Sequence, residues 1–173
     1  MSSLSATSRY TGFVLAVHLN SRGFGWVLFE NAHTPVAWSL VRAGAANDAR
    51  LLSRFKRVID RYEPRVVVFE AFDQSVAHRS DRIQRLYRAM GEEAKKRGVE
   101  TPIFDREVVQ LAFAKFGAST RPEIAAVIAK HIPAFAHRLP RERKFGAGED
   151  ARQCLFDATA VAITYFTYRG ELD

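Results

Sequence analysis

The order of apolar and polar positions predicts a chain that begins in β-structure and then alternates between helices and strands. Two runs rich in β-branched and aromatic residues, FVLAVHL and GFGWVLFE, flank the segment NSRG at residues 20–23. Asn, Ser and Gly favour turns, so we expect a tight hairpin here. A third strand over residues 36–41 would complete an antiparallel meander.

The hydrophobic period changes after residue 50. Apolar residues at helical spacing run from Leu51 to Tyr62, and Pro64 ends the predicted helix. The following run RVVVFE, at residues 65–70, predicts a buried central strand that ends in Glu70. The remaining pattern predicts helices over residues 80–97, 106–115 and 120–132, a strand over residues 99–104, and a last helix that begins near Glu149 and Asp150.

This order indicates an α/β protein with a mixed five-stranded sheet. A three-strand antiparallel meander is followed by crossover units, and we expect helices on both faces of the sheet. The length of 173 residues suits one ordinary domain, which we expect to span residues 12–170 after a flexible N-terminus at residues 1–11. Residues 133–148 hold Pro, Gly and several basic side chains, and predict a mobile loop.

Composition and charge narrow the choice of partners. Lys and Arg number 26 against 19 Asp and Glu, and the resulting net charge of +7 favours phosphate backbones or anionic lipid. Cys154 is the one cysteine and cannot close an intrachain disulfide. The longest apolar run near the start, residues 13–17, is too short for a signal segment or a membrane span. We therefore expect a cytoplasmic protein with no membrane partner.

Acidic residues at the ends of two predicted elements indicate candidate chemistry. Glu70 ends the central strand, at the edge of the sheet where α/β proteins place ligands. Asp150 and Asp157 are seven residues apart, about two turns, so one helix would present both on the same face. His18 lies within the first strand. Carboxylates that meet in this way predict a divalent-cation site, because Mg²⁺ prefers oxygen ligands.

Four segments, in order along residues 12–168, resemble the RuvC-type Holliday junction resolvases, a family of RNase H-like nucleases. They are VLAVHLNSRGFGWVLF at residues 14–29, RVVVFE at 65–70, FGASTRPEIAAVIAKHI at 116–132 and CLFDATAVAITYF at 154–166. The resemblance implies an RNase H-like fold. It also implies a divalent-metal-dependent, structure-specific endodeoxyribonuclease that cuts branched DNA with two metal ions.

The resemblance carries over to site residues with two departures. Glu70 matches the glutamate of the family's strand, and Asp157 matches the last acid of its final helix. His18 stands where the family has its bridging aspartate, and Cys154 stands where it has an earlier acid or histidine. A neutral imidazole removes one negative charge, so the metal shell of His18, Glu70, Asp150 and Asp157 would favour Mn²⁺ over Mg²⁺ if His18 is a ligand.

The resemblance also indicates partners. Branched DNA would lie across a basic surface, and two symmetric cuts need two sites related by a two-fold axis, which implies a homodimer. The residues that we expect to contact phosphates are Arg22, Lys115, Arg121, Arg143 and Lys144.

Each candidate also has a purely structural explanation, and these explanations remain open at the level of sequence. His18 could be a hydrogen-bonded core histidine, Glu70 and Asp157 could be ion-pair partners of arginines, and Asp150 could stabilise a helix N-terminus. Three functions therefore stand: a metal-dependent nuclease, a catalytically impaired nucleic-acid-binding or assembly protein on the same fold, and a scaffold subunit whose charge serves only solubility.

Overall fold

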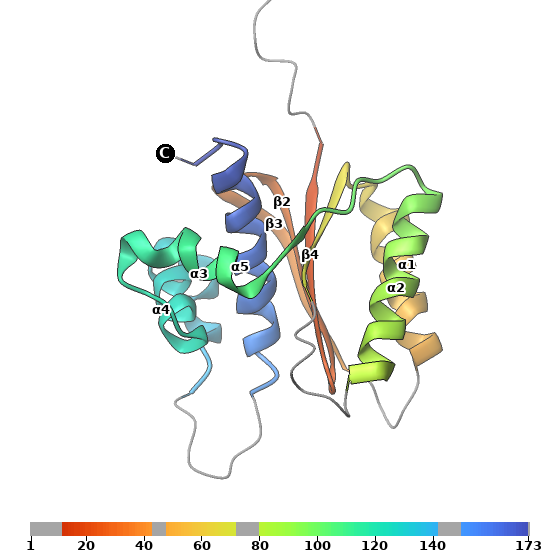
Figure 1. Cartoon of the computed structure of the whole chain (residues 1–173), viewed down its shortest axis with the longest axis horizontal. Helices are drawn as coiled ribbons and strands as arrows, with labels where there is room; N and C mark the ends of the chain where they lie inside the picture. The colour runs from red at the N-terminus through yellow and green to blue at the C-terminus, as the bar shows by residue number, and fades with distance from the viewer. Residues whose placement is uncertain (1–11, 43–47, 72–79, 142–149, 173) are drawn as a thin grey trace, which may run out of the picture.

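The structure is a computed structural model and describes residues 12–42, 48–71, 80–141 and 150–172. Its centre is a five-stranded sheet in the order β3-β2-β1-β4-β5 (Figure 1). The strands are β1 Val14–Asn20, β2 Gly23–Asn31, β3 Thr34–Arg42, β4 Val66–Glu70 and β5 Ile103–Phe104. The first three form an antiparallel meander, and β4 and β5 continue the sheet in parallel with β1. The predicted α/β fold with a mixed sheet is therefore confirmed.

Helices cover both faces of the sheet, as Figure 1 shows. On one face lie α1 (Asp48–Tyr62) and α2 (Ser80–Lys96), and on the other lie α3 (Arg106–Phe113), α4 (Arg121–His131) and α5 (Gln153–Tyr168). Successive side chains of a strand point to opposite faces, so β1 divides its apolar residues between two cores. Val14 and Ala16 belong to the core with α5, whereas Leu15 and Val17 belong to the core with α1 and α2. Within the ranges described, no helix is long and apolar enough to cross a bilayer.

The fifth strand is shorter than the pattern of residues 99–104 predicts. Glu100 makes only an isolated bridge with Val66, and regular pairing is confined to Ile103 and Phe104. Pro102 lies between these segments and has no N–H to donate. Its carbonyl still accepts from the N–H of Phe69 at 3.0 Å, so β4 remains hydrogen-bonded along this side.

Part of the predicted mobile loop is ordered. Residues Pro133–Arg138 form a short 3₁₀ helix, η3, because Phe135 is fully buried. Its ring packs edge-on against Trp38 at 4.9 Å and contacts Phe156 at 6.2 Å between centroids. Residues 142–149 of this loop, like the N-terminal residues 1–11, lie outside the described residues.

The last helix begins at Gln153, later than predicted. Asp150 precedes it, and its carboxylate accepts from the backbone N–H of Arg152 at 2.9 Å and from the guanidinium of the same residue. Such local bonds favour a turn over a helix. Asp150 and Asp157 therefore do not share one helix, and the predicted arrangement of both on one face is wrong.

The helix α5 is buried along most of its length and approaches the sheet very closely at Gly25 of β2. A Cβ atom at this position would lie 2.6 Å from the backbone carbon and 2.7 Å from the backbone oxygen of Cys154. Gly25 is also the register partner of His18 on β1. The missing side chain therefore lets the first turn of α5 rest directly above the end of β1.

We expect Gly25→Ala to destabilise the protein by about 2–3 kcal/mol, because backbone rather than a flexible side chain must move to admit the methyl group. Urea unfolding followed by circular dichroism measures this. Gly91→Ala on α2 is the matched control, since nothing lies within 4 Å of its added Cβ. Helix propensity predicts a gain of up to about 1 kcal/mol there. Equal effects of the two substitutions would contradict the close approach at Gly25.

Candidate functional site

Three buried side chains from β1, β4 and α5 meet at one end of the sheet. Nδ1 of His18 lies 3.2 Å from Oε2 of Glu70, and Nε2 of His18 lies 3.5 Å from Oδ2 of Asp157. The parallel register that pairs Val17 with Phe69 sets His18 beside Glu70, and α5 places Asp157 above them. The three residues are exposed by only 7%, 5% and 2% respectively. We call His18, Glu70 and Asp157 the histidine–carboxylate centre.

Two arginines approach the same carboxylates from outside. Nη1 of Arg106 lies 3.6 Å from Oε1 of Glu70, and Nη1 of Arg121 lies 3.8 Å from Oδ2 of Asp157. Arg106 is the first residue of α3, and Arg121 is the first residue of α4. The side-chain amide of Gln153 donates to Oδ1 of Asp157 at 3.0 Å. Each carboxylate of the centre therefore faces the imidazole on one side and a guanidinium on another.

The surroundings of His18 favour its protonated form. Burial opposes the charge, but the carboxylates of Asp157 and Glu70 outweigh burial and raise the pKa of the imidazole above its ordinary value of 6.5. Glu70 responds in the opposite sense: burial opposes its charge, yet His18 and Arg106 lower the pKa of its carboxyl below the ordinary 4.5. The centre is thus a buried ion-pair network of both signs.

These residues do not fit the predicted pair of divalent ions. The imidazole occupies the space between the two carboxylates, where a shared metal would need their oxygens. With His18 protonated, three cationic side chains face two anionic ones, so a dication would enter a site that already carries net positive charge. In the described part of the chain, no group of three or more His, Cys, Asp or Glu residues has a geometry suited to metal ligation.

Known structures share this fold. The RuvC of Thermus thermophilus in complex with a Holliday junction substrate superposes with a TM-score of 0.68 at 17% identity, covering 91% of this chain and 94% of that one. This chain has the fold of the RuvC-type Holliday junction resolvases. A second Thermus thermophilus RuvC structure gives a TM-score of 0.66 at 16% identity, with 92% of this chain and 97% of the other covered.

The RuvC-type fold extends to a eukaryotic resolvase. The yeast mitochondrial Holliday junction resolvase Ydc2 superposes with a TM-score of 0.63 at 12% identity, covering 94% of this chain and 80% of its own. No family model and no curated protein matches the sequence. The resemblance to RuvC-type resolvases, and with it the RNase H-like fold, is therefore confirmed at the level of structure.

The other predicted site residues lie in different environments. The carboxylate of Asp150 is held by Arg152, with Oδ2 2.6 Å from Nη2, and this guanidinium lowers the pKa of Asp150 to about 2. Arg22 is exposed in the turn between β1 and β2. Lys115 extends over the ring of Phe116, with Nζ 5.3 Å from the centroid. Arg143 and Lys144 lie outside the described residues.

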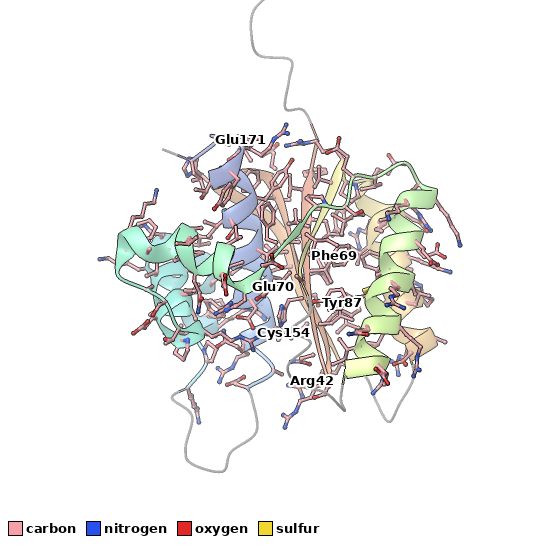
Figure 2. The ribbon with its side chains drawn as sticks, in the orientation of Figure 1. Arg42, Phe69, Glu70, Tyr87, Cys154 and Glu171 are labelled. Carbon is pink, nitrogen blue, oxygen red and sulfur yellow. The ribbon has the colours of Figure 1, made fainter. Side chains whose placement is uncertain are left out.

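Sequence reasoning missed two neighbours of the centre, Arg106 and Gln153. Tyr87 of α2 lies on the opposite face of the sheet, where its ring packs against Phe69, its Oη accepts the N–H of Leu19 at 3.2 Å, and burial raises the pKa of its phenol. Figure 2 shows Cys154 on the α5 side of the sheet and Tyr87 on the α2 side. Of the two missed neighbours, Arg106 was the easier to predict. It follows β5 by two residues, and β5 ends at the same edge of the sheet as β4.

The ion pairs of His18 predict a pH dependence of stability. Because the folded protein raises the pKa of His18, its charge stabilises the fold fully below pH 6.5, and this contribution disappears as pH rises through the folded pKa. We expect the free energy of unfolding to fall as the pH rises above 6.5 and through the folded pKa of His18. His18→Gln should flatten this part of the profile, whereas His33→Gln, which removes an exposed imidazole, should leave it unchanged. Urea unfolding at successive pH values measures the profile, and a slope that His18→Gln retains would contradict the assignment.

Proposed function

We propose that the chain binds branched nucleic acid through its phosphates, on a resolvase fold whose centre is not assembled for two-metal hydrolysis. One observation carries the proposal: the His18 imidazole lies between Glu70 and Asp157, within 3.2 and 3.5 Å of their oxygens. The charge that a cleaving centre would take from metal ions is supplied here by His18, Arg106 and Arg121. Such a surface attracts a phosphate backbone without a metal.

Charge and fold support the class of ligand. The chain has a net charge of +7, and electrostatic attraction to phosphates dominates the affinity of proteins for nucleic acid. Arg121 is half-exposed beside the centre, and Arg22 is exposed in the β1–β2 turn. The Thermus thermophilus RuvC with this fold was solved with a Holliday junction substrate, which makes a four-way junction the first ligand to test. The predicted homodimer belongs to the same proposal, because two-fold symmetry suits a junction.

A metal-dependent nuclease is the second candidate, and a specific observation favours it. Glu70 and Asp157 converge on one imidazole from β4 and α5, the elements that the resemblance assigns to the family's acids. A deprotonated His18 would offer a nitrogen that suits Mn²⁺ better than Mg²⁺. Junction cleavage in Mn²⁺ that Glu70→Gln and Asp157→Asn each abolish would establish this candidate.

The primary test compares affinities for a four-way junction and for a linear duplex of the same length by fluorescence anisotropy. We expect tighter binding to the junction in the presence of EDTA, and a loss of about 10³-fold or more between 50 and 200 mM salt if six or more phosphates are contacted. We expect no cleavage in Mg²⁺. Equal affinity for junction and duplex would contradict structure-selective binding, and light scattering of the complex tests the dimer.

A substitution at His18 tests the metal-free centre directly. We expect His18→Asp to have a lower Tm without metal, because three carboxylates then meet with fewer cations. Mn²⁺ at 100 times its Kd should raise the Tm of this variant by about 5–10 °C, since such binding stabilises by about 2.7 kcal/mol.

Differential scanning fluorimetry measures these shifts. His33→Asp is the control, because it introduces the same carboxylate at an exposed position. We expect Mn²⁺ to leave the Tm of the wild type and of this control nearly unchanged. A wild-type shift as large as that of His18→Asp would contradict a centre that carries its own cations.

A further inference from the structure

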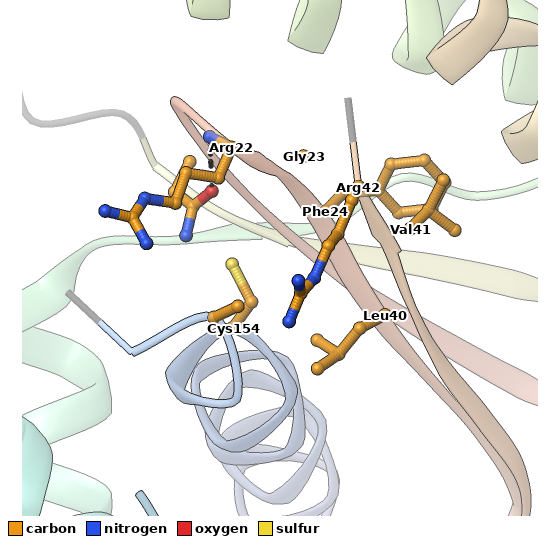
Figure 3. Close-up of a pocket in the computed structure, with 9 residues that line it drawn as sticks. Arg22, Gly23, Phe24, Leu40, Val41, Arg42 and Cys154 are labelled. Atoms are coloured by element: carbon orange, nitrogen blue, oxygen red, sulfur yellow. Dashed lines mark hydrogen bonds between the residues drawn. The ribbon is translucent and has the colours of Figure 1, made fainter. Parts of the chain in front are cut away.

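A second feature lies beside the histidine–carboxylate centre and is not explained by it. A shallow, open recess is formed by the β1–β2 turn, the end of β3 and the start of α5. Figure 3 shows that Arg22 and Arg42 lie on either side of Cys154 at this recess. We call it the Arg22–Arg42 pocket.

The charge of the pocket is positive. Nine of the described residues line it, and these include two arginines but no Asp or Glu. Arg22 and Arg42 are both exposed, and no described carboxylate lies within ion-pair distance of either. The floor is apolar, because it is formed by Leu40 and by Cys154, which is buried to 3% exposure. Cations at the rim of an apolar floor attract an anion more strongly than the same cations in open solvent.

Sheet register brings the two arginines together. Gly23 pairs with Asn20 on one side and with Arg42 on the other, so the β1–β2 turn and the end of β3 share one edge. Gly23 has φ of 146°, and a Cβ here would lie 1.9 Å from the carbonyl oxygen of Val41. Only glycine permits this approach. The glycine thus fixes the distance between the strand that carries Arg42 and the turn that carries Arg22.

The pocket also offers a neutral hydrogen-bond donor. Oδ1 of Asn20 accepts the backbone N–H of Arg22 at 2.8 Å. This bond assigns the acceptor end of the amide, so its NH₂ group remains a donor among the lining residues. Two guanidiniums and an amide NH₂ are groups that bind phosphate oxygens.

The position of the pocket relates it to the centre. Asn20 follows His18 by two residues on β1, so both side chains lie on the same face of the sheet, about 7 Å apart along the strand. Cys154 precedes Asp157 by three residues on α5, about one turn. The pocket therefore continues the centre along the sheet toward the β1–β2 turn.

We propose that the Arg22–Arg42 pocket binds a backbone phosphate of a nucleic-acid strand that passes over the histidine–carboxylate centre. The inference rests on the proposed function and adds a specific subsite to it, in which Arg42 acts together with Arg22. The arginines neutralise the phosphate, and the amide of Asn20 orients it. Cys154 and Leu40 close the floor, so the subsite takes a phosphate and not a base.

The test is the salt dependence of junction binding by the full-length chain. Arg22→Gln/Arg42→Gln should reduce the slope of log affinity against log salt by about 1 and weaken binding at low salt by about 10-fold, because one phosphate contact is lost. Arg54→Gln/Arg57→Gln is the matched control. It removes the same charge from exposed positions of α1, on the opposite face of the sheet, and should leave the slope unchanged.

Two further measurements separate a direct contact from other causes. Arg22→Lys/Arg42→Lys should keep most of the slope, since the charges remain, and a Tm close to that of the wild type shows that the glutamine variant is folded. If the wild type prefers junctions but the glutamine variant matches the Arg54/Arg57 control, the pocket proposal is wrong and the proposed function stands. If the wild type binds no nucleic acid at low salt, both are wrong.

Discussion

The end of the sheet depends on the compensation of two buried carboxylates. Glu70 and Asp157 are exposed by 5% and 2%, and an isolated carboxylate at such burial is very costly. In this chain the compensation comes from within, through the imidazole of His18 and the guanidiniums of Arg106 and Arg121. Removing one member of a buried network of this kind leaves an unpaired charge, which costs more than the intact pair contributes. The positions of β1, β4 and α5 at this end are therefore coupled electrostatically as well as by packing.

This compensation changes what the fold offers to a ligand. A site that holds metal ions presents carboxylates with unmet charge, whereas these carboxylates are already matched. The remaining positive charge lies at the rim, on Arg121 at 42% side-chain exposure and on Arg22 and Arg42 around the neighbouring pocket. The described residues at this end of the sheet therefore present a basic rim above carboxylates that face cationic side chains.

The sequence predicted the elements well because their signals are local. Alternating and continuous apolar runs identified β1, β2 and β4, and a capping box of Thr120 and Glu123 starts α4 close to the predicted helix boundary. The errors have identifiable causes. Pro102 shortens β5 through a missing donor, and the side-chain bonds of Asp150 with Arg152 delay the start of α5.

The candidate site was harder to predict than the fold, because its character depends on contacts between distant segments. Glu70, Asp157 and His18 could be named from motif positions, but whether the imidazole binds a metal or pairs with carboxylates depends on the geometry between β1, β4 and α5. Arg106 and Arg42 lie in no sequence motif that would mark them as functional. Their roles depend on strand register, which pairs Arg42 with Gly23 and sets β5 beside β4.

The carboxylates of the centre are held rigidly, whereas the arginines around it have more freedom to move. Glu70 and Asp157 stand on a fully buried strand and on a helix buried along most of its length, so neither can move without disturbing the core. Arg106 and Arg121 begin shorter peripheral helices and have longer, partly solvated side chains, at 24% and 42% exposure. A phosphate that binds here would therefore compete with the carboxylates of Glu70 and Asp157 for the guanidiniums of Arg106 and Arg121. On the proposed function, phosphate recognition at this surface would exchange one anionic partner of the arginines for another while the backbone stays in place.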